Sequence, residues 1–235
     1  MLLGVNIDHI ATLRNARGEN FPSPIEGAKI CMQSGANGIT AHLREDRRHI
    51  KDEDIKNLKA LGIRLNMEMA ATKEMQDIAL KVHPDACCIV PEKRQEITTE
   101  GGLDVYSQQS RITEFVKPLI NAGILVSLFI DPIQNQVEAA SKTGAQYIEL
   151  HTGTFANSYS TNNEEQEFQK LKSAAILAQS LGLKVNAGHG LNYDNVHRMH
   201  EIPNIEELNI GHSIISKAIF VGLGNAVSEM LNLIK

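Results

Sequence analysis

The segment GANGITAH, residues 35–42, occurs in two further versions, GAQYIELH at 144–151 and GLKVNAGH at 182–189. Each version begins with glycine and ends with histidine after six intervening residues. Glycine is typical of the left-handed position that ends a helix, and the residues after it suit a turn and a strand. The repeat therefore predicts a helix, a turn and a strand that ends at the histidine.

The same order of elements extends along the whole chain, where short segments of β-type composition alternate with segments of helical periodicity. The predicted strands are residues 2–7, 38–43, 64–69, 86–90, 125–130, 147–150, 184–188 and 207–211. The predicted helical segments are residues 25–34, 53–61, 73–82, 111–120, 133–142, 168–181 and 215–234. Strict alternation implies parallel strands joined by right-handed crossovers. Eight such units predict an α/β fold, a closed eight-stranded parallel (β/α)8 TIM barrel, with residues 1–235 as a single domain. A doubly wound open sheet is the structural alternative.

The composition favours a globular protein that handles a small ligand. Hydrophobic residues make up 42% of the chain and charged residues 22%, which suffices for a core. A net charge of −5, no tryptophan and 4% aromatic residues argue against a nucleic-acid partner. The N-terminal apolar segment is interrupted at Asn6 and Asp8, so neither a signal peptide nor a membrane span is expected. Three cysteines without a C-x-x-C pair suit buried thiols in a reducing cytoplasm.

The connections that leave the predicted strands are longer than those that enter them. They cover residues 8–23, 43–51, 91–109 and 151–163. Long loops in a compact domain are usually functional, and barrel enzymes place their active sites at the carboxyl ends of the strands. Both signals predict an active site at the same end of the barrel.

Polar side chains are frequent at that predicted end. Glu68 and Glu149 lie within predicted strands, where a buried carboxylate is costly unless it is paired or has a function. The residues at or just after the strand ends are Asn6, Asp8, His9, His42, Arg44, Glu68, Glu92, Lys93, Arg94, Asp131, Glu149, His151, His189 and His212. One such histidine alone would be unremarkable, but the whole set predicts a polar active site.

The segment NAGHGLNYDNVHRMH, residues 186–200, contains three histidines with different expected roles. His189 ends a predicted strand and is expected to transfer protons. His197 and His200 lie three residues apart on the predicted helix that follows, where packing or surface exposure is the ordinary interpretation.

Two kinds of residue suggest phosphate binding. Arg44 follows His42 by two residues and could bind a phosphate with its planar guanidinium group, and Arg17 could do so from a mobile first loop. AGHG at 187–190 and NIGHS at 209–213 leave strands through glycine and enter helices, a pattern typical of phosphate binding in barrels. No HExxH or comparable motif is present, so no metal is expected.

Seven segments together resemble the pyridoxine 5'-phosphate synthase family from the first strand to the last helix. They are VNIDHIATLRNARG (5–18), GITAHLREDRRHI (38–50), LNMEMA (65–70), VPEKRQEITTEGGLDV (90–105), YIELHTG (147–153), AGHGLNY (187–193) and NIGHSIISKAI (209–219). The resemblance implies a (β/α)8 barrel that condenses 3-amino-2-oxopropyl phosphate with 1-deoxy-D-xylulose 5-phosphate, with release of phosphate and water. It also implies no metal or organic cofactor and assembly into homo-octamers.

The resemblance also implies roles for individual residues. His42 would be a general acid/base, Glu68 a proton acceptor, His189 the proton donor, and Glu149 would stabilise charge in a transition state. The aminoketone phosphate would be held by Asn6 and Arg17, and the pentulose phosphate by Asp8, His9, Arg44, His49 and Thr98. Gly190, Gly211 and His212 would form the phosphate cradle.

Two alternatives remain at this point. The first is another phosphosugar isomerase or epimerase on the same barrel, which would need one phosphate site and one or two acid–base groups. The second is a non-catalytic module that binds a phosphorylated vitamin. The two separated phosphate-binding sets favour a two-substrate enzyme, and a turnover assay distinguishes an enzyme from a binding module.

Overall fold

Apolar and polar side chains alternate along the strands, which gives the protein an apolar layer and a polar barrel interior. In β3 (Leu65–Met69), the side chains of Leu65, Met67 and Met69 are fully buried in the main apolar core. Asn66 lies between them in sequence and donates a hydrogen bond to Thr40 of β2 (Gly38–His42), which in turn donates to Asn209. Because successive side chains of a strand point to opposite faces, one face packs against helices and the other fills the barrel.

The computed structural model describes residues 1–92 and 101–235. Its remaining strands are β1 (Leu2–Asn6), β4 (Ala86–Ile89), β5 (Leu125–Ile130), β6 (Tyr147–His151), β7 (Lys184–Gly188) and β8 (Ile205–Ile210). All neighbouring strands pair in parallel, and β8 pairs with β1. The sheet is therefore a closed barrel in the order β1 to β8, which confirms the predicted TIM barrel and excludes the open-sheet alternative.

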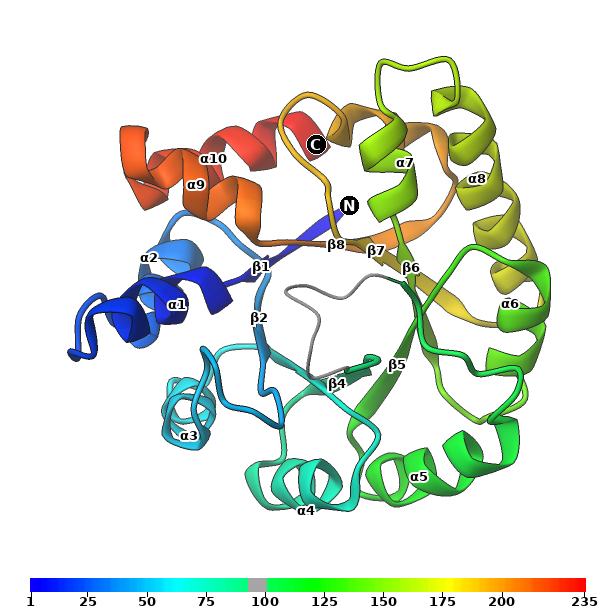
Figure 1. Cartoon of the computed structure of the whole chain (residues 1–235), viewed down its shortest axis with the longest axis horizontal. Coiled ribbons are helices and arrows are strands. Elements are labelled where there is room, and N and C mark those ends of the chain that lie inside the picture. The colour runs from blue at the N-terminus through cyan, green and yellow to red at the C-terminus, as the bar shows by residue number, and fades with distance from the viewer. Residues whose placement is uncertain (93–100) are drawn as a thin grey trace.

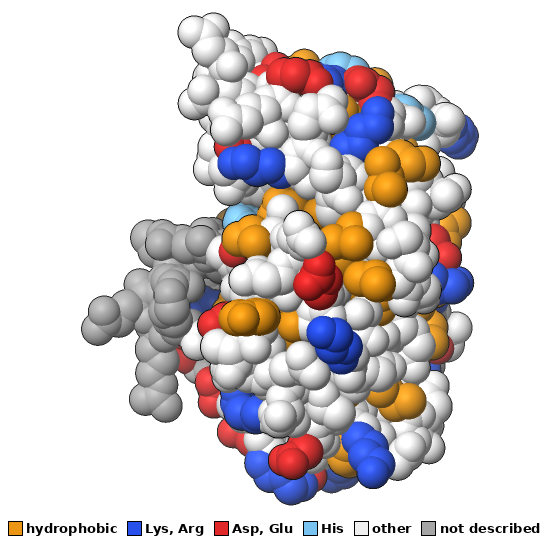
Figure 2. Space-filling model, turned by 90° about the vertical axis from the view of Figure 1, so that its right-hand side faces the viewer, with side chains coloured by type: hydrophobic (Ala, Val, Ile, Leu, Met, Phe, Trp, Pro, Cys, Tyr) orange, Lys and Arg blue, Asp and Glu red, His pale blue; other side chains and the backbone are white. Residues whose placement is uncertain are grey.

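Helices surround this barrel, as Figure 1 shows. They are α1 (Asp8–Arg17), α2 (Pro24–Gln33), α3 (Asp52–Ala60), α4 (Lys73–Val82), α5 (Gln109–Asn121), α6 (Gln134–Ala140), α7 (Gly153–Ser158), α8 (Glu164–Ser180), α9 (His212–Val221) and α10 (Leu223–Ile234), with a 3-10 helix η1 (Val196–Glu201). The flank formed by α6 and α8 carries charged side chains among small separate apolar patches (Figure 2). No helix in the described ranges is both long and apolar enough to cross a membrane.

Several predicted boundaries were wrong. The segment 8–23 is mostly helix α1 rather than a loop, and 151–163 contains helix α7. The last predicted helix divides into α9 and α10 at Gly222, whose φ of 83° is left-handed. His197 and His200 lie on the 3-10 helix η1 instead of an α-helix. Short polar helices such as α1 carry little apolar periodicity, which explains why the periodicity did not reveal them.

Candidate active site

A cavity of about 680 Å³ opens at the carboxyl ends of the strands. It brings together residues from β1, β2, β3, β5, β6 and β8, and from the segment after β7, that are far apart in sequence. The predicted site residues that line it are Asn6, Asp8, His9, His42, Arg44, His49, Glu68, Glu149, His189, Gly190, Gly211 and His212. The expectation that these side chains converge at one end of the barrel is therefore met.

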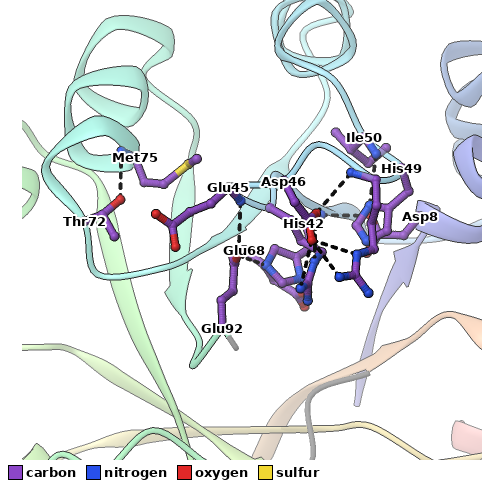
Figure 3. Close-up of polar contacts among 12 residues, drawn as sticks. Asp8, His42, Glu45, Asp46, His49, Ile50, Glu68, Thr72, Met75 and Glu92 are labelled. Atoms are coloured by element: carbon purple, nitrogen blue, oxygen red, sulfur yellow. Dashed lines mark hydrogen bonds and ion pairs between the residues drawn. The ribbon is translucent and has the colours of Figure 1, made fainter. Parts of the chain in front are cut away.

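His42 lies between three carboxylates at the end of β2 (Figure 3). The strand register places it beside Glu68, and its Nδ1 lies 3.8 Å from Glu68 Oε2. Its Nε2 lies 2.8 Å from Oε1 of Glu92, and its backbone N–H donates to Asp8 Oδ1 at 2.9 Å. The second oxygen of Glu92 accepts the backbone N–H of Glu45 at 3.0 Å. These contacts hold the imidazole in one orientation with one nitrogen toward Glu68.

The two strand glutamates have pKa values raised above their ordinary values. Burial, and then the charges of Glu149 and Asp8, raise the pKa of Glu68 well above its ordinary value. Burial raises the pKa of Glu149 to about 7, although a hydrogen bond from Asn209 Nδ2 at 2.7 Å acts in the opposite direction. With a pKa of about 7, Glu149 can both accept and donate protons under physiological conditions.

His189 follows β7 with a left-handed backbone, at φ 77°. Its ring is open to the cavity, and its carbonyl oxygen accepts a hydrogen bond from Thr152 Oγ1 at 2.5 Å. Loss of bulk water at the cavity wall, together with the charge of His151, lowers the pKa of His189 to about 4. The imidazole is therefore neutral at pH 7 when the cavity holds no anion.

The segment around β1 and β8 is suited to an anion. Helices α1 and α9 begin at Asp8 and His212, so their N-terminal N–H groups and the positive ends of their dipoles lie at the cavity. The rings of His9 and His212 approach to 3.0 Å between their Nδ1 atoms. Burial and the charge of His212 lower the pKa of His9. A bound phosphate would favour protonation of His9.

Arg44 and His49 line the cavity on the other side of β1, beyond β2. The Arg44 guanidinium is 4% exposed and lies 3.3 Å from Asp46. His49 Nδ1 accepts the backbone N–H of Ile50 at 2.9 Å, so the proton of the neutral ring is on Nε2. Burial lowers the pKa of His49. This second group supplies donors that are separate from the glycines of β7 and β8.

One predicted residue among those described is not brought to the cavity. Arg17 is the last residue of α1, and its side chain is 80% exposed and paired with Glu19 at 3.3 Å. The prediction that it lies in a loop was wrong, because helix α1 includes it. Thr98 lies outside the described residues.

Sequence reasoning assigned no role to several residues that complete the site. Glu92, Asp131 and His151 were recognised at strand ends, but their hydrogen bonds depend on contacts between different strands. Asn209 was noticed only as part of NIGHS, and its amide binds Glu149. An asparagine inside a predicted strand is a signal of the same kind as Glu68, because a buried amide also needs partners.

Asp8, His42 and His49 have potential metal-ligating atoms within 4.8 Å of one another. Several of the potential ligand atoms already make hydrogen bonds. Asp8 accepts the backbone N–H of His42 and the amide of Asn6, and His42 Nε2 bonds Glu92. This engagement makes the cluster a better match for proton transfer than for a metal centre.

The barrel and this cavity define a class: a (β/α)8 enzyme whose acid–base groups and anion-binding groups face one cavity. The chain belongs to the PdxJ family, described as "Pyridoxal phosphate biosynthesis protein PdxJ", whose sequence pattern matches residues 3–235.

Similar proteins agree with this placement. The pyridoxine 5'-phosphate synthases of Geotalea uraniireducens (strain Rf4) and Geotalea daltonii are each 56% identical to this chain over 234 residues, which covers 99% of the chain and 98% of each relative. A solved phosphoribosyl anthranilate isomerase from Thermus thermophilus has a TM-score of 0.59 at 11% identity, with 100% of this chain and 98% of that one covered. At such low identity the last likeness shows the barrel fold alone.

Proposed function

We propose that the chain is a pyridoxine 5'-phosphate synthase, which condenses 3-amino-2-oxopropyl phosphate with 1-deoxy-D-xylulose 5-phosphate. The observation that carries the proposal is the convergence of four acid–base groups, His42, Glu68, Glu149 and His189, on one cavity between two anion-binding groups. The 56% identity to proteins of that name supports it. Residues 1–235 act as one barrel domain in this proposal.

The chemistry explains why so many titratable groups are needed. Joining an amine to a ketone, expelling phosphate and closing an aromatic ring requires repeated proton transfers at neighbouring atoms. His42 serves as general acid/base and Glu68 as proton acceptor, because the raised pKa of Glu68 gives this carboxylate the basicity that the step needs. Glu149 stabilises charge that develops in a transition state.

His189 is the proton donor in this proposal, although its pKa of about 4 leaves it neutral in the empty cavity. A phosphate dianion in the cradle of Gly190, Gly211 and His212 would raise the pKa of His189 by attraction. Substrate binding would then charge the donor. Because binding precedes proton transfer in this scheme, His189 becomes an acid only when the reactants are in place.

The resemblance to the family assigns the substrate contacts. Asp8, His9, Arg44, His49 and Thr98 hold the pentulose phosphate, and Asn6 and Arg17 hold the aminoketone phosphate. Arg17 would have to leave Glu19 and turn toward the cavity, which its exposed position permits. Two groups of phosphate-binding donors lie on opposite sides of β1. They favour this two-substrate reaction over an isomerase or epimerase, which needs only one phosphate-binding group.

Turnover of the purified protein tests the proposal directly. Chelator-treated protein is mixed with both phosphate substrates, without added metal or organic cofactor. It is expected to form pyridoxine 5'-phosphate, and the absorbance of this product measures the reaction. Protein that binds the substrates and forms no product would support the binding-module alternative. Product formed only after a metal is restored would contradict the cofactor-free mechanism.

Two variants test the assigned roles. His189→Ala is expected to lower turnover by about 10²- to 10⁴-fold, the usual effect of a lost acid or base, with little loss of stability.

Glu68→Gln is expected to remove one limb of the pH–rate profile. A Glu68→Gln enzyme with full rate and unchanged pH dependence would make Glu68 a structural residue.

A cytoplasmic homo-octamer completes the proposal. Three cysteine thiols are buried and unpaired, which suits a reducing compartment. Apolar side chains that are unusually exposed for a monomer include Phe21, Ile219 and Phe220, at 79%, 74% and 86%. Light scattering coupled to size exclusion measures the assembly, and a monomeric mass with full activity would contradict the octamer.

A further inference from the structure

We propose that Asp131 and His151 form a positioning pair that orients His189, an inference that rests on the proposed function of His189 as proton donor. Asp131 follows β5, and His151 ends β6. Neither residue lines the cavity itself. His151 contacts His189 and Phe129, which both line it, and Asp131 also accepts the backbone N–H of Gly102.

The first contact fixes the imidazole of His151. Its Nδ1 lies 2.9 Å from Oδ1 of Asp131, and the residue is 7% exposed. The hydrogen bond from His151 holds the pKa of Asp131 below its usual range, so the carboxylate is ionised and can only accept. Nδ1 of His151 must therefore carry a proton, which sets the tautomer of the neutral ring and its orientation.

The second contact transmits this orientation to His189. The rings of His151 and His189 meet edge to face, with centroids 5.1 Å apart and planes at 69°. Phe129 contacts both rings, with its centroid 5.1 Å from that of His151 and 6.4 Å from that of His189, and Thr152 Oγ1 binds the carbonyl oxygen of His189. The rest of the His189 ring faces the cavity, so its direction depends on His151 and Phe129.

Gly153 shows how closely the two rings converge. A Cβ atom at this position would lie 2.4 Å from Nε2 of His151 and 3.1 Å from Cδ2 of His189. The first distance is shorter than real Cβ contacts and the second is tight, so any side chain at this position would displace the His151 ring and crowd that of His189. The HTG segment at 151–153 therefore acts as one unit that supports the proton donor.

Steady-state kinetics of Asp131→Asn and His151→Asn test the proposal. Each is expected to lower kcat by about 10- to 100-fold, the usual cost of losing an outer hydrogen-bond partner, with the KM of both substrates within about 2-fold of wild type. Gly153→Ala should reproduce this loss by displacing the rings, which provides a second route if one variant folds poorly. Asp77→Asn and His83→Asn are matched controls on α4 and should retain full activity.

Combination with His189→Ala gives the deciding measurement. Residues that act only through His189 cannot slow an enzyme that lacks it, so His151→Asn/His189→Ala should be as active as His189→Ala alone. Additive losses in the double variant, or full kcat in Asp131→Asn and His151→Asn, would overturn the positioning role. Absence of product from the wild-type enzyme would instead contradict the proposed function, so the two failures are distinguishable.

Discussion

At the scale of single residues, surroundings give identical side chains different chemistry. Glu149 and Glu92 both border the site, but burial raises the pKa of Glu149 to about 7. Burial also acts on Glu92, yet the hydrogen bond and charge of His42 lower its pKa instead. Glu149 can thus exchange protons near neutral pH, while Glu92 stays ionised and holds His42. Opposed pKa values of this kind are how one site obtains both an acid–base group and a fixed charge.

Asn209→Leu is expected to raise the pKa of Glu149 further. The amide donates to the ionised carboxylate, and loss of a hydrogen bond to the charged form favours protonation, by about one pH unit. Carbon-13 NMR of labelled glutamate measures the shift. Thr40→Val removes the other hydrogen bond of Asn209 and should change the pKa less. A Glu149 pKa that falls in Asn209→Leu would refute this account.

Binding of a phosphate ester is expected to take up a proton at pH 6 to 7. The pKa of His189 lies near 4 in the empty cavity, and a nearby dianion raises it. Calorimetric titration in buffers of different ionisation enthalpy measures the number of protons taken up. His189→Ala should reduce this number. Equal uptake by both proteins would assign the proton to another group, such as His9.

At the scale of elements, helix α1 holds the segment 43–51 against the cavity. Arg14 of α1 forms a two-pronged ion pair with Asp54 of α3, with N···O distances of 2.6 and 2.9 Å. Arg14 Nη2 and Asn15 Nδ2 also donate to the carbonyl oxygen of His49, at 3.1 and 2.8 Å. The helix that periodicity missed is therefore the element that positions His49.

Arg14→Ala is expected to destabilise the protein by about 3 kcal/mol, because the buried Asp54 would lose its ion-pair partner and keep only the backbone N–H of Lys51. The double variant Arg14→Ala/Asp54→Ala should lose less, since no charge is left unpaired. Urea denaturation measures both. Lys73→Ala breaks an exposed pair with Asp77 and should cost under about 0.5 kcal/mol. Equal losses in the single and double variants would show that the unpaired charge contributes nothing.

At the scale of the whole molecule, closure of the barrel places carboxyl groups where they reduce stability at neutral pH. The folded-state pKa of Glu149 is raised above its ordinary value of 4.5 to about 7. Its contribution to stability is therefore complete below pH 4.5 and is lost as the pH rises through 7. The lowered pKa of His189 acts in the other direction, because its contribution is present above pH 6.5 and is lost as the pH falls toward 4.

Glu149→Gln is expected to be more stable than wild type at pH 8, by up to about 3 kcal/mol, with a smaller difference at pH 4.5. The neutral amide avoids the cost of ionising a buried group. Urea unfolding at the two pH values measures the difference, and turnover should fall in the same variant. A stability difference that does not depend on pH would show that ionisation of Glu149 is not its cause.

Much of the architecture was predictable because its signals are local. All eight predicted strands overlap the observed ones, since β-type composition and glycine turns act over a few residues. Polar residues at strand ends likewise identified most of the cavity, because parallel closure brings all carboxyl ends to one side. Helix α7 and the break at Gly222 escaped prediction, because each depends on packing rather than on composition.

By itself the sequence determined the barrel, the end of the barrel that carries the site and the residue types available there. Only the tertiary structure decided which side chains pair: His42 with Glu92, His151 with Asp131, and Glu149 with Asn209, across 50, 20 and 60 residues. The physical reason is the distance along the chain over which each signal acts. Periodicity and turn propensity act between neighbours in the chain, whereas partners of this kind depend on strand register and barrel closure.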